Sequence, residues 1–351
     1  MIVRALVAMS ALIGAAALPA AAAPASRGAG AELPARAFQA WCSASSLCTY
    51  VPTGDAGASS LRRGGATWAG ADDRFTRAQA RRAGGPVAYY PMMLGGIAVA
   101  VNVPGIQGHN VDLRGTTIAE IFSGTIRNWN DKRIRQTNLH HPLPRNLPIT
   151  LCVPARPSGE SWDFSEYLAR VSAIFRRQVG GASPRPKWRA PKIVRTPRMT
   201  AVGDCMQANR GAITFLPIAD AMREGLTSHV VAVGKRERVT HGKGVAARTV
   251  VRNVFTHPTG TAIAKAGRMS TARATSAPTL DLLNSPVPGA YPITTEAYAV
   301  TRSDRPINRL TLRTLRYFLS PAAQRKLQGL GYAPLPANLA TVTRARLAAA
   351  R

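Results

Sequence analysis

Short apolar runs rich in β-branched residues alternate with helical patterns along most of this 351-residue chain. Each run ends at a turn or leads into a helical pattern, and the clearest are 48–51, 95–105, 147–154, 211–217 and 291–301. Strands that alternate with helices predict an α/β protein with mainly parallel sheets. The length is sufficient for two domains and a sizeable core.

Apolar residues at helical spacing predict helices at 33–41, 116–124, 308–319 and 321–330. A Gly/Ala-rich segment before the first of these is typical of a turn. Two other stretches, 180–200 and 232–290, are rich in Pro, Gly, Arg and Thr. We expect them to form long surface loops.

The first 23 residues have the three parts of a secretory signal peptide. Arg4 supplies a positive charge, an uncharged apolar stretch follows over 5–18, and small residues at 19–23 suit cleavage. The apolar stretch is shorter than the ~20 residues of a membrane span, although an uncleaved anchor is the alternative. We therefore predict a cleaved signal peptide at 1–23 and a periplasmic or secreted protein.

Four cysteines suit an exported protein, in which disulfides persist. Cys42 and Cys48 are close enough to close a local turn, and Cys152 with Cys205 would then close a long loop. Four cysteines allow three connectivities, so this pairing is one of three. Zinc binding has little support, because the chain contains no CxxC motif and its six histidines are scattered.

The formal net charge of +29 favours an anionic partner, such as phosphate, nucleic acid or lipid headgroups. The alternative is a solvated surface without a specific partner, since the charges are spread along the chain. Aromatic residues make up only 6% of the sequence, which argues against a base-stacking surface. We therefore expect no nucleic-acid partner.

Three loops place small or hydroxyl residues before a helical pattern, and they are 28–33, 53–57 and 156–161. Helix N-termini carry unsatisfied N–H groups and a partial positive charge, so several aimed at one point bind an anion. Asp72, in AGADDR, would repel an anion unless that anion carries a proton to donate. The alternative for each loop is helix capping without a ligand.

Common catalytic and nucleotide motifs are absent from the sequence, which contains no GxxxxGK[ST], HExxH or GxSxG. We therefore expect a binding protein rather than an enzyme, with neither a metal nor an organic cofactor.

Taken together, the segments resemble the periplasmic phosphate-binding proteins of bacterial ABC transporters, the PstS type. GAGAELPAR (28–36) resembles the family's GAGATFPAP, WAGADDR resembles FGASDAP, and GGIAVAVNVPG resembles GGVVPVVNLPG. AEIFSGTIRNWND, LPITLCVPARPSGESWDFSEYL and LGYAPLP have counterparts in the same order. The likeness covers most of 28–345 and is weakest over 230–285.

The resemblance implies a two-lobed periplasmic binding protein of the class II type, with two crossover strands as the hinge. Lobe 1 would comprise 24–97 and 292–351, and lobe 2 would comprise 98–291. The family's role implies a monomer that captures inorganic phosphate between the lobes and delivers it to an ABC permease in the inner membrane.

Carried over by position, the family's pocket is partly kept. The residues that supply the same group as the family's are Leu33 (through its backbone N–H), Thr53, Asp72, Ser158 and Gly159. Glu32 and Glu160 replace threonines, and Pro154 replaces an arginine. Arg156 lies two positions after Pro154, so in an extended segment it points to the same side and can replace the lost cation.

Two inward glutamates beside Asp72 would oppose a doubly charged anion. They must point away, hold protons, or pair with arginine; otherwise the ligand is not phosphate. The alternative function is a secreted relative that acts outside transport, on a polyanion or an amine-bearing ligand.

Overall fold

The computed structural model describes residues 26–54, 56–241, 248–268 and 280–350, and the predicted signal peptide at 1–23 lies outside them. The strands are β1 (Ser26–Gly30), β2 (Cys48–Pro52), β3 (Trp68–Ala71), β4 (Val87–Asn102), β5 (Asp112–Arg114), β6 (Thr150–Pro154), β7 (Lys192–Thr196), β8 (Ala212–Pro217), β9 (Ala232–His241), β10 (Arg248–Thr256) and β11 (Thr294–Arg302). The first helices are α1 (Ala35–Ser45), α2 (Ala56–Arg63), α3 (Arg77–Ala83), α4 (Gly115–Phe122), α5 (Lys132–Arg135), α6 (Gly159–Val171) and α7 (Ala173–Gln178). The later helices are α8 (Val202–Ala208), α9 (Ile218–Arg223), α10 (Gly260–Ala266), α12 (Arg309–Phe318), α13 (Pro321–Arg325) and α14 (Ala337–Ala349).

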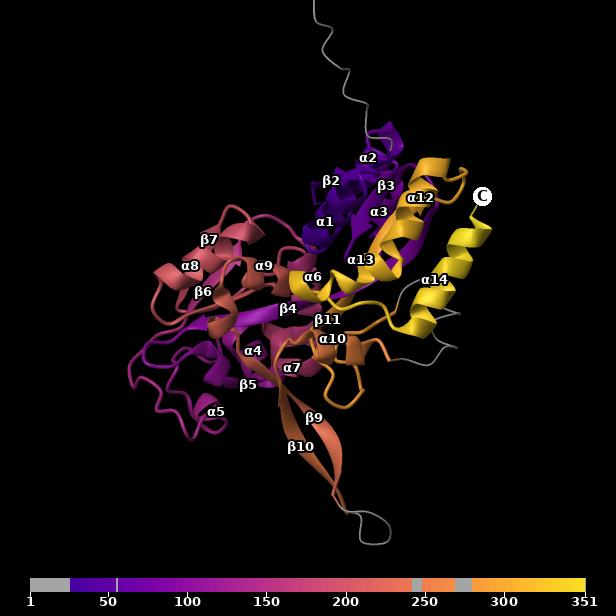
Figure 1. Cartoon of the computed structure of the whole chain (residues 1–351). Coiled ribbons are helices and arrows are strands. Elements are labelled where there is room, and N and C mark those ends of the chain that lie inside the picture. The colour runs from indigo at the N-terminus through magenta and orange to yellow at the C-terminus, as the bar shows by residue number, and fades with distance from the viewer. Residues whose placement is uncertain (1–25, 55, 242–247, 269–279, 351) are drawn as a thin grey trace, which may run out of the picture.

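One sheet of eight strands, in the order β2-β1-β3-β11-β4-β8-β6-β7, passes through both halves of the molecule (Figure 1). The long strand β4 links the halves, because residues 87–96 pair with β11 and residues 97–102 pair with β8. This arrangement confirms the predicted α/β class and the two-lobed fold with crossing strands. The lobe boundaries at 97/98 and 291/292 stay predictions.

The sheet is mixed, with four parallel and three antiparallel strand pairings, so the expectation of mainly parallel sheets holds by a small majority. β1 pairs in parallel with β2 and β3, and β6 pairs in parallel with β7 and β8. The crossing strands β4 and β11 run antiparallel to each other and to their outer neighbours β8 and β3. A strand that enters one lobe and a strand that returns from it necessarily run in opposite directions.

Each half of the sheet carries its own aromatic cluster. The first half packs α1 and α12 on the sheet through Phe38, Trp41, Tyr50, Trp68 and Phe318. The second half packs α4 and α6 on the sheet through Phe122, Phe164, Phe175, Trp188 and Phe215. Rings at these separations contribute packing beyond the area they bury, so both lobes have a cohesive core.

The predicted disulfide pairing is confirmed. Cys42 is bonded to Cys48 across the turn between α1 and β2, and Cys152 on β6 is bonded to Cys205 on α8. The second bond spans 53 positions within lobe 2, so it constrains the unfolded chain more strongly than the first bond, which spans 6.

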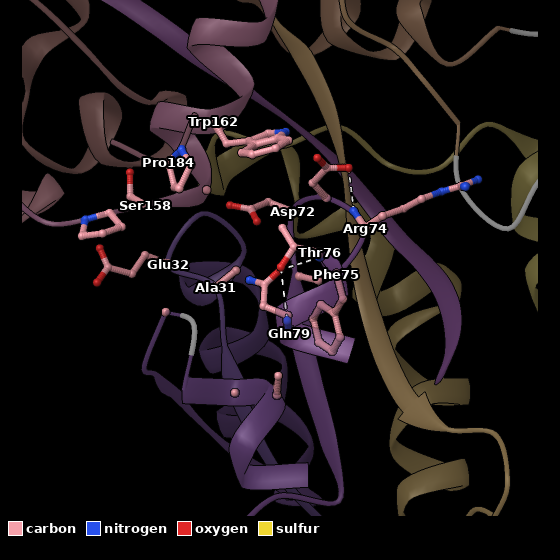
Figure 2. Close-up of a pocket in the computed structure, with 18 of the residues that line it drawn as sticks. Ala31, Glu32, Asp72, Arg74, Phe75, Thr76, Gln79, Ser158, Trp162 and Pro184 are labelled. Carbon is pink, nitrogen blue, oxygen red and sulfur yellow. Dashed lines mark hydrogen bonds between the residues drawn. The ribbon is translucent and has the colours of Figure 1, made fainter. Parts of the chain in front are cut away.

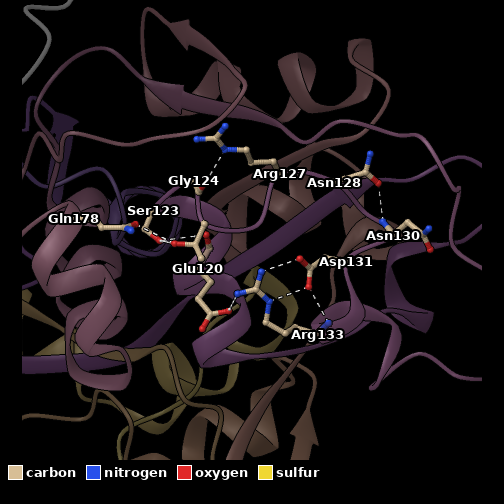
Figure 3. Close-up of polar contacts among 10 residues, drawn as sticks. Glu120, Ser123, Gly124, Arg127, Asn128, Asn130, Asp131, Arg133 and Gln178 are labelled. Carbon is tan, nitrogen blue, oxygen red and sulfur yellow. Dashed lines mark hydrogen bonds and ion pairs between the residues drawn. The ribbon is translucent and has the colours of Figure 1, made fainter.

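The AEIFSGTIRNWND segment is a structural element between α4 and α5 (Figure 3). The Arg133 guanidinium donates to Asp131 at 2.8 and 2.9 Å and to Glu120 at 2.9 Å. Trp129 is fully buried, and its indole N–H donates to the carbonyl oxygen of Gly211 at 2.9 Å. These contacts fix the turn after α4 and explain this part of the family pattern without a ligand.

Several segments expected to be turns or loops contain regular structure. Residues 26–30 form a strand instead of a turn, and residues 192–196 form β7. The stretch 232–290, expected to form loops, contains the β9–β10 hairpin and α10. Pairing between these two adjacent strands stabilises them as a hairpin, although both strands contain arginines. α14 was not predicted, although its alanine, leucine and arginine residues favour a helix.

Within the part of the chain that the structure describes, no helix combines the length and the apolar character of a membrane span.

Candidate functional site

A cavity of about 230 Å³ opens where the ends of β1 and β3 and the start of α2 face the start of α6. All three predicted loops contribute to its wall, through Ala31 and Glu32, through Gly54 and Gly57, and through 157–160. Because α2 begins against β1, a Cβ atom on Gly57 would lie 2.6 Å from the Cα atom of Gly30. Glycine is therefore what lets the second loop reach the cavity.

Five of the eight predicted site residues line this cavity, and they are Glu32, Asp72, Ser158, Gly159 and Glu160. The other three are not part of its described wall. Leu33 is buried, with its carbonyl oxygen accepting from the Tyr332 hydroxyl at 2.6 Å. Thr53 and Arg156 are exposed beside the cavity.

The start of α6 meets Asp72 from the opposite lobe. Ser158 caps the helix, because its hydroxyl oxygen accepts from the N–H of Ser161 at 3.1 Å. A Cβ atom on Gly159 would lie 2.3 Å from Asp72 Oδ2, so the carboxylate packs against the first turn of the helix. The partial positive charge of that helix end stabilises the Asp72 anion.

Glu160 points into the interior although it belongs to the first turn of α6. It is 1% exposed, and its Oε1 atom has no hydrogen-bond partner among the described residues. Burial is the main cause that raises the pKa of Glu160 well above its usual value, followed by the charges of Asp72 and Glu32. This side chain therefore keeps its proton to a higher pH than an exposed glutamate.

Asp163 extends the acidic cluster one turn further along α6. It is 2% exposed, and its Oδ2 atom likewise has no hydrogen-bond partner within the described chain. Burial raises the pKa of Asp163 well above its usual value, and the charges of Asp72, Asp73 and Glu160 add to the effect. Each of these carboxyl groups therefore disfavours ionisation of its neighbours.

Glu32 lies on the β1 side of the cavity and is half-buried. Burial and the charge of Asp220 raise the pKa of Glu32, whereas the charges of Arg198 and Arg156 lower it. The guanidinium of Arg156 is thus near enough to act on this side of the cavity. Arg74 and Arg82 are the arginines in its described wall.

The aromatic and polar residues of the far wall were not predicted from the sequence. Figure 2 shows Trp162 from α6 and Phe75 from the segment before α3 on the cavity. Thr76 and Gln79 form a capping box at the start of α3, with bonds of 2.8 and 3.2 Å. The Thr-x-x-Gln spacing is a sequence signal that could have placed this helix start beside the cavity.

The described residues contain no group of three or more His, Cys, Asp or Glu side chains that could hold a metal ion. What the cavity offers is a helix N-terminus, a packed aspartate, carboxyl groups whose pKa is raised by burial, and neighbouring guanidinium groups. Such a site can bind a small oxyanion that carries a proton, or a small ligand that brings hydrogen-bond donors of its own.

The family model described as "PBP superfamily domain" matches residues 19–322. Phosphate-binding protein PstS of Haemophilus influenzae is 37% identical over 91 residues, which are 26% of this chain and 27% of that protein. PstS of Xylella fastidiosa is 26% identical over 257 residues, which are 71% of this chain and 64% of that protein. The chain thus matches less than two thirds of the length of either relative.

Among solved structures, the fold is similar to that of PfluDING, a high-affinity periplasmic phosphate-binding protein bound with phosphate. The TM-score is 0.65 at 18% sequence identity, over 91% of this chain and 93% of that one. The comparison confirms the two-lobed fold, and the relatives confirm the resemblance to PstS-type proteins.

Proposed function

We propose that this chain, which belongs to the PBP superfamily, is an exported solute-binding protein that captures inorganic phosphate between its lobes. Its role is to deliver phosphate to an ABC permease, and it works as a monomer. The observation that carries the proposal is the meeting of three helix-start loops at one cavity. In this proposal the lobes are 24–97 with 292–351, and 98–291.

The proposed phosphate lies against the start of α6, where Ser158 and Gly159 line the cavity. Asp72 accepts a hydrogen bond from the protonated oxygen of hydrogen phosphate. The Leu33 N–H and the Thr53 hydroxyl approach from the β1 and β2 side when the lobes close, and Arg156 supplies the cation. Lobe closure around a ligand is expected for this fold class.

Glu160 is compatible with phosphate because of its raised pKa. Two full charges about 4 Å apart repel by about 4 kcal/mol at an effective dielectric of 20, which an ionised glutamate would impose on the anion. A neutral carboxyl group instead donates a hydrogen bond. Phosphate binding should therefore hold Glu160 in its protonated form.

Calorimetry with inorganic phosphate tests the proposal on protein freed of bound ligand. We expect saturable binding, which D72N should weaken and make less selective against sulfate. Asp304 is an exposed aspartate outside the cavity, so D304N is the matched control and should bind as the wild type does. Absence of binding at millimolar phosphate would end the proposal.

A second candidate is an amine-bearing small ligand. It is favoured by one observation, the presence of Glu32, Asp72 and Glu160 on the same cavity. E160Q separates the candidates, because glutamine stays neutral and still donates hydrogen bonds. Phosphate binding should be retained in E160Q and lose part of its pH dependence, whereas binding of an amine should weaken. Mass spectrometry of copurified small molecules identifies the amine directly.

A further inference from the structure

The β9–β10 hairpin has no part in the proposed function. In Figure 1 its two strands extend away from the body of the protein as a two-stranded ribbon. Only the base of β9 pairs with the body, where 232–234 run parallel to β5. In the described chain, the distal parts of both strands pair only with each other, from Arg236–Asn253 to His241–Arg248.

Buried polar contacts hold the base of the hairpin in place. The Lys235 ammonium donates to the carbonyl oxygens of Ser285 and Val287 at 2.7 and 2.8 Å, and it lies 3.3 Å from Glu237. Glu237 also accepts from the N–H of Gly289 at 3.0 Å. The ribbon is therefore anchored at its base and presents its distal part to the surroundings.

Apolar side chains are exposed on both faces of the ribbon. Val250 and Val251 are 45% and 52% exposed, and both belong to the small set of exposed large apolar side chains in the described chain. Neighbouring residues of a strand point to opposite faces, so these two valines cannot cover the same partner surface. Protein docking onto one face would leave the other valine in water, whereas insertion into an interface would bury both.

The charges around these valines are positive. Arg236, Arg238 and Arg252 are exposed, and Arg238 pairs directly across from Val251. Glu237 is the only acidic residue in the two strands, and Lys235 already pairs with it. Arginine side chains keep their charge in the headgroup region while their stems cover apolar surface.

From these observations we propose that the distal β9–β10 hairpin docks on the surface of an anionic phospholipid membrane. The two valines enter the headgroup boundary from opposite faces, and the three arginines contact lipid phosphates. A nucleic acid fits less well, because the exposed side chains that the structure describes on β9 and β10 include no aromatic group for base stacking. The net charge of +29 supports attraction of the whole protein to such a surface.

Vesicle cosedimentation of the exported protein tests this proposal, with every variant carrying the same N-terminus. The wild type should bind phosphatidylglycerol-containing vesicles and not pure phosphatidylcholine vesicles. Neutralising the three arginines to glutamine should weaken binding about a hundredfold, at about 1 kcal/mol per charge. V250T with V251T keeps charge, shape and β-branching, and should weaken binding about tenfold.

The control neutralises the same number of charges elsewhere. Arg309, Arg313 and Arg316 are exposed on α12, and their change to glutamine should leave most of the vesicle binding intact. Equal losses in the two arginine variants would overturn the proposal, since general charge attraction explains them. Unchanged binding of the valine variant, with displacement from vesicles by duplex DNA, would overturn it in favour of a soluble polyanion. Circular dichroism checks that each variant is folded.

Discussion

Replacing Glu296 with glutamine should stabilise the protein at neutral pH. Glu296 lies on the crossing strand β11 and is 1% exposed. Its carboxylate accepts from the N–H of Leu280 at 2.9 Å and from the Tyr298 hydroxyl. Burial raises its pKa to about 7, and these two hydrogen bonds and the charge of Arg346 only partly oppose the effect.

Glu296 should make the wild type less stable as the pH rises, because the unfolded chain releases the proton of this carboxyl group at a lower pH than the folded protein does. Below pH 4.5 the carboxyl group is protonated in the folded and the unfolded protein, so its ionisation contributes nothing to the pH dependence. As the pH rises, the unfolded chain ionises first, so the folded protein loses about 1.4 kcal/mol per pH unit until its own pKa near 7. The loss totals about 3 kcal/mol above pH 7, and glutamine should not show it.

Urea unfolding of the wild type and of E296Q between pH 4.5 and 8 measures this difference. The free energy of unfolding of E296Q minus that of the wild type should rise with pH and level off above pH 7. D131N is a control without this pH dependence, because Arg133 lowers the pKa of Asp131 below its usual value of 3.8. Asp131 therefore stays ionised in the folded and the unfolded protein over most of this range, and the difference between D131N and the wild type should stay nearly constant. A difference between E296Q and the wild type that stays constant across the pH range would refute the reasoning.

Three further changes test the site and the cores. G159A would place a Cβ atom 2.3 Å from Asp72 Oδ2, so it should displace that carboxylate. Phosphate affinity measured by calorimetry should then fall about tenfold. Unchanged affinity would argue against the role of Asp72 in binding phosphate. Changing both Cys152 and Cys205 to alanine opens a loop of 53 positions and should cost about 4 kcal/mol, measured as a lower urea midpoint. W129F removes a buried indole N–H donor and should cost about 2 kcal/mol; a cost near zero would show that this hydrogen bond does not hold the turn.

Part of the site was predictable because its residues sit in local patterns. Ser158 and Gly159 precede an amphipathic stretch, and the predicted cap at Ser158 is present. Asp72 was recognised because a carboxylate is unusual beside an anion. The contribution of Trp162 was missed, because a tryptophan on an amphipathic helix also fits a core position, and only the opposing lobe makes it part of a cavity wall.

The orientation of Glu160 could not be predicted in the same way. First-turn acids usually face water and stabilise their helix dipole, and the sequence allowed that reading. Here the side chain is buried because the first turn of α6 lies against Asp72, and the charges of Asp72 and Glu32 act on it. Its raised pKa is therefore a property of the interface between lobes.

The sequence by itself determined the order of most strands and helices, the α/β class and the loops that end at the cavity. Apolar periodicity, caps and turns act over a few residues, so they can be read locally. Only the tertiary structure decided the mixed sheet, the β9–β10 ribbon, and the burial of Glu160 and Glu296. Those features depend on which distant segments meet and on how much water their contact excludes. Neither can be inferred from a short stretch of residues.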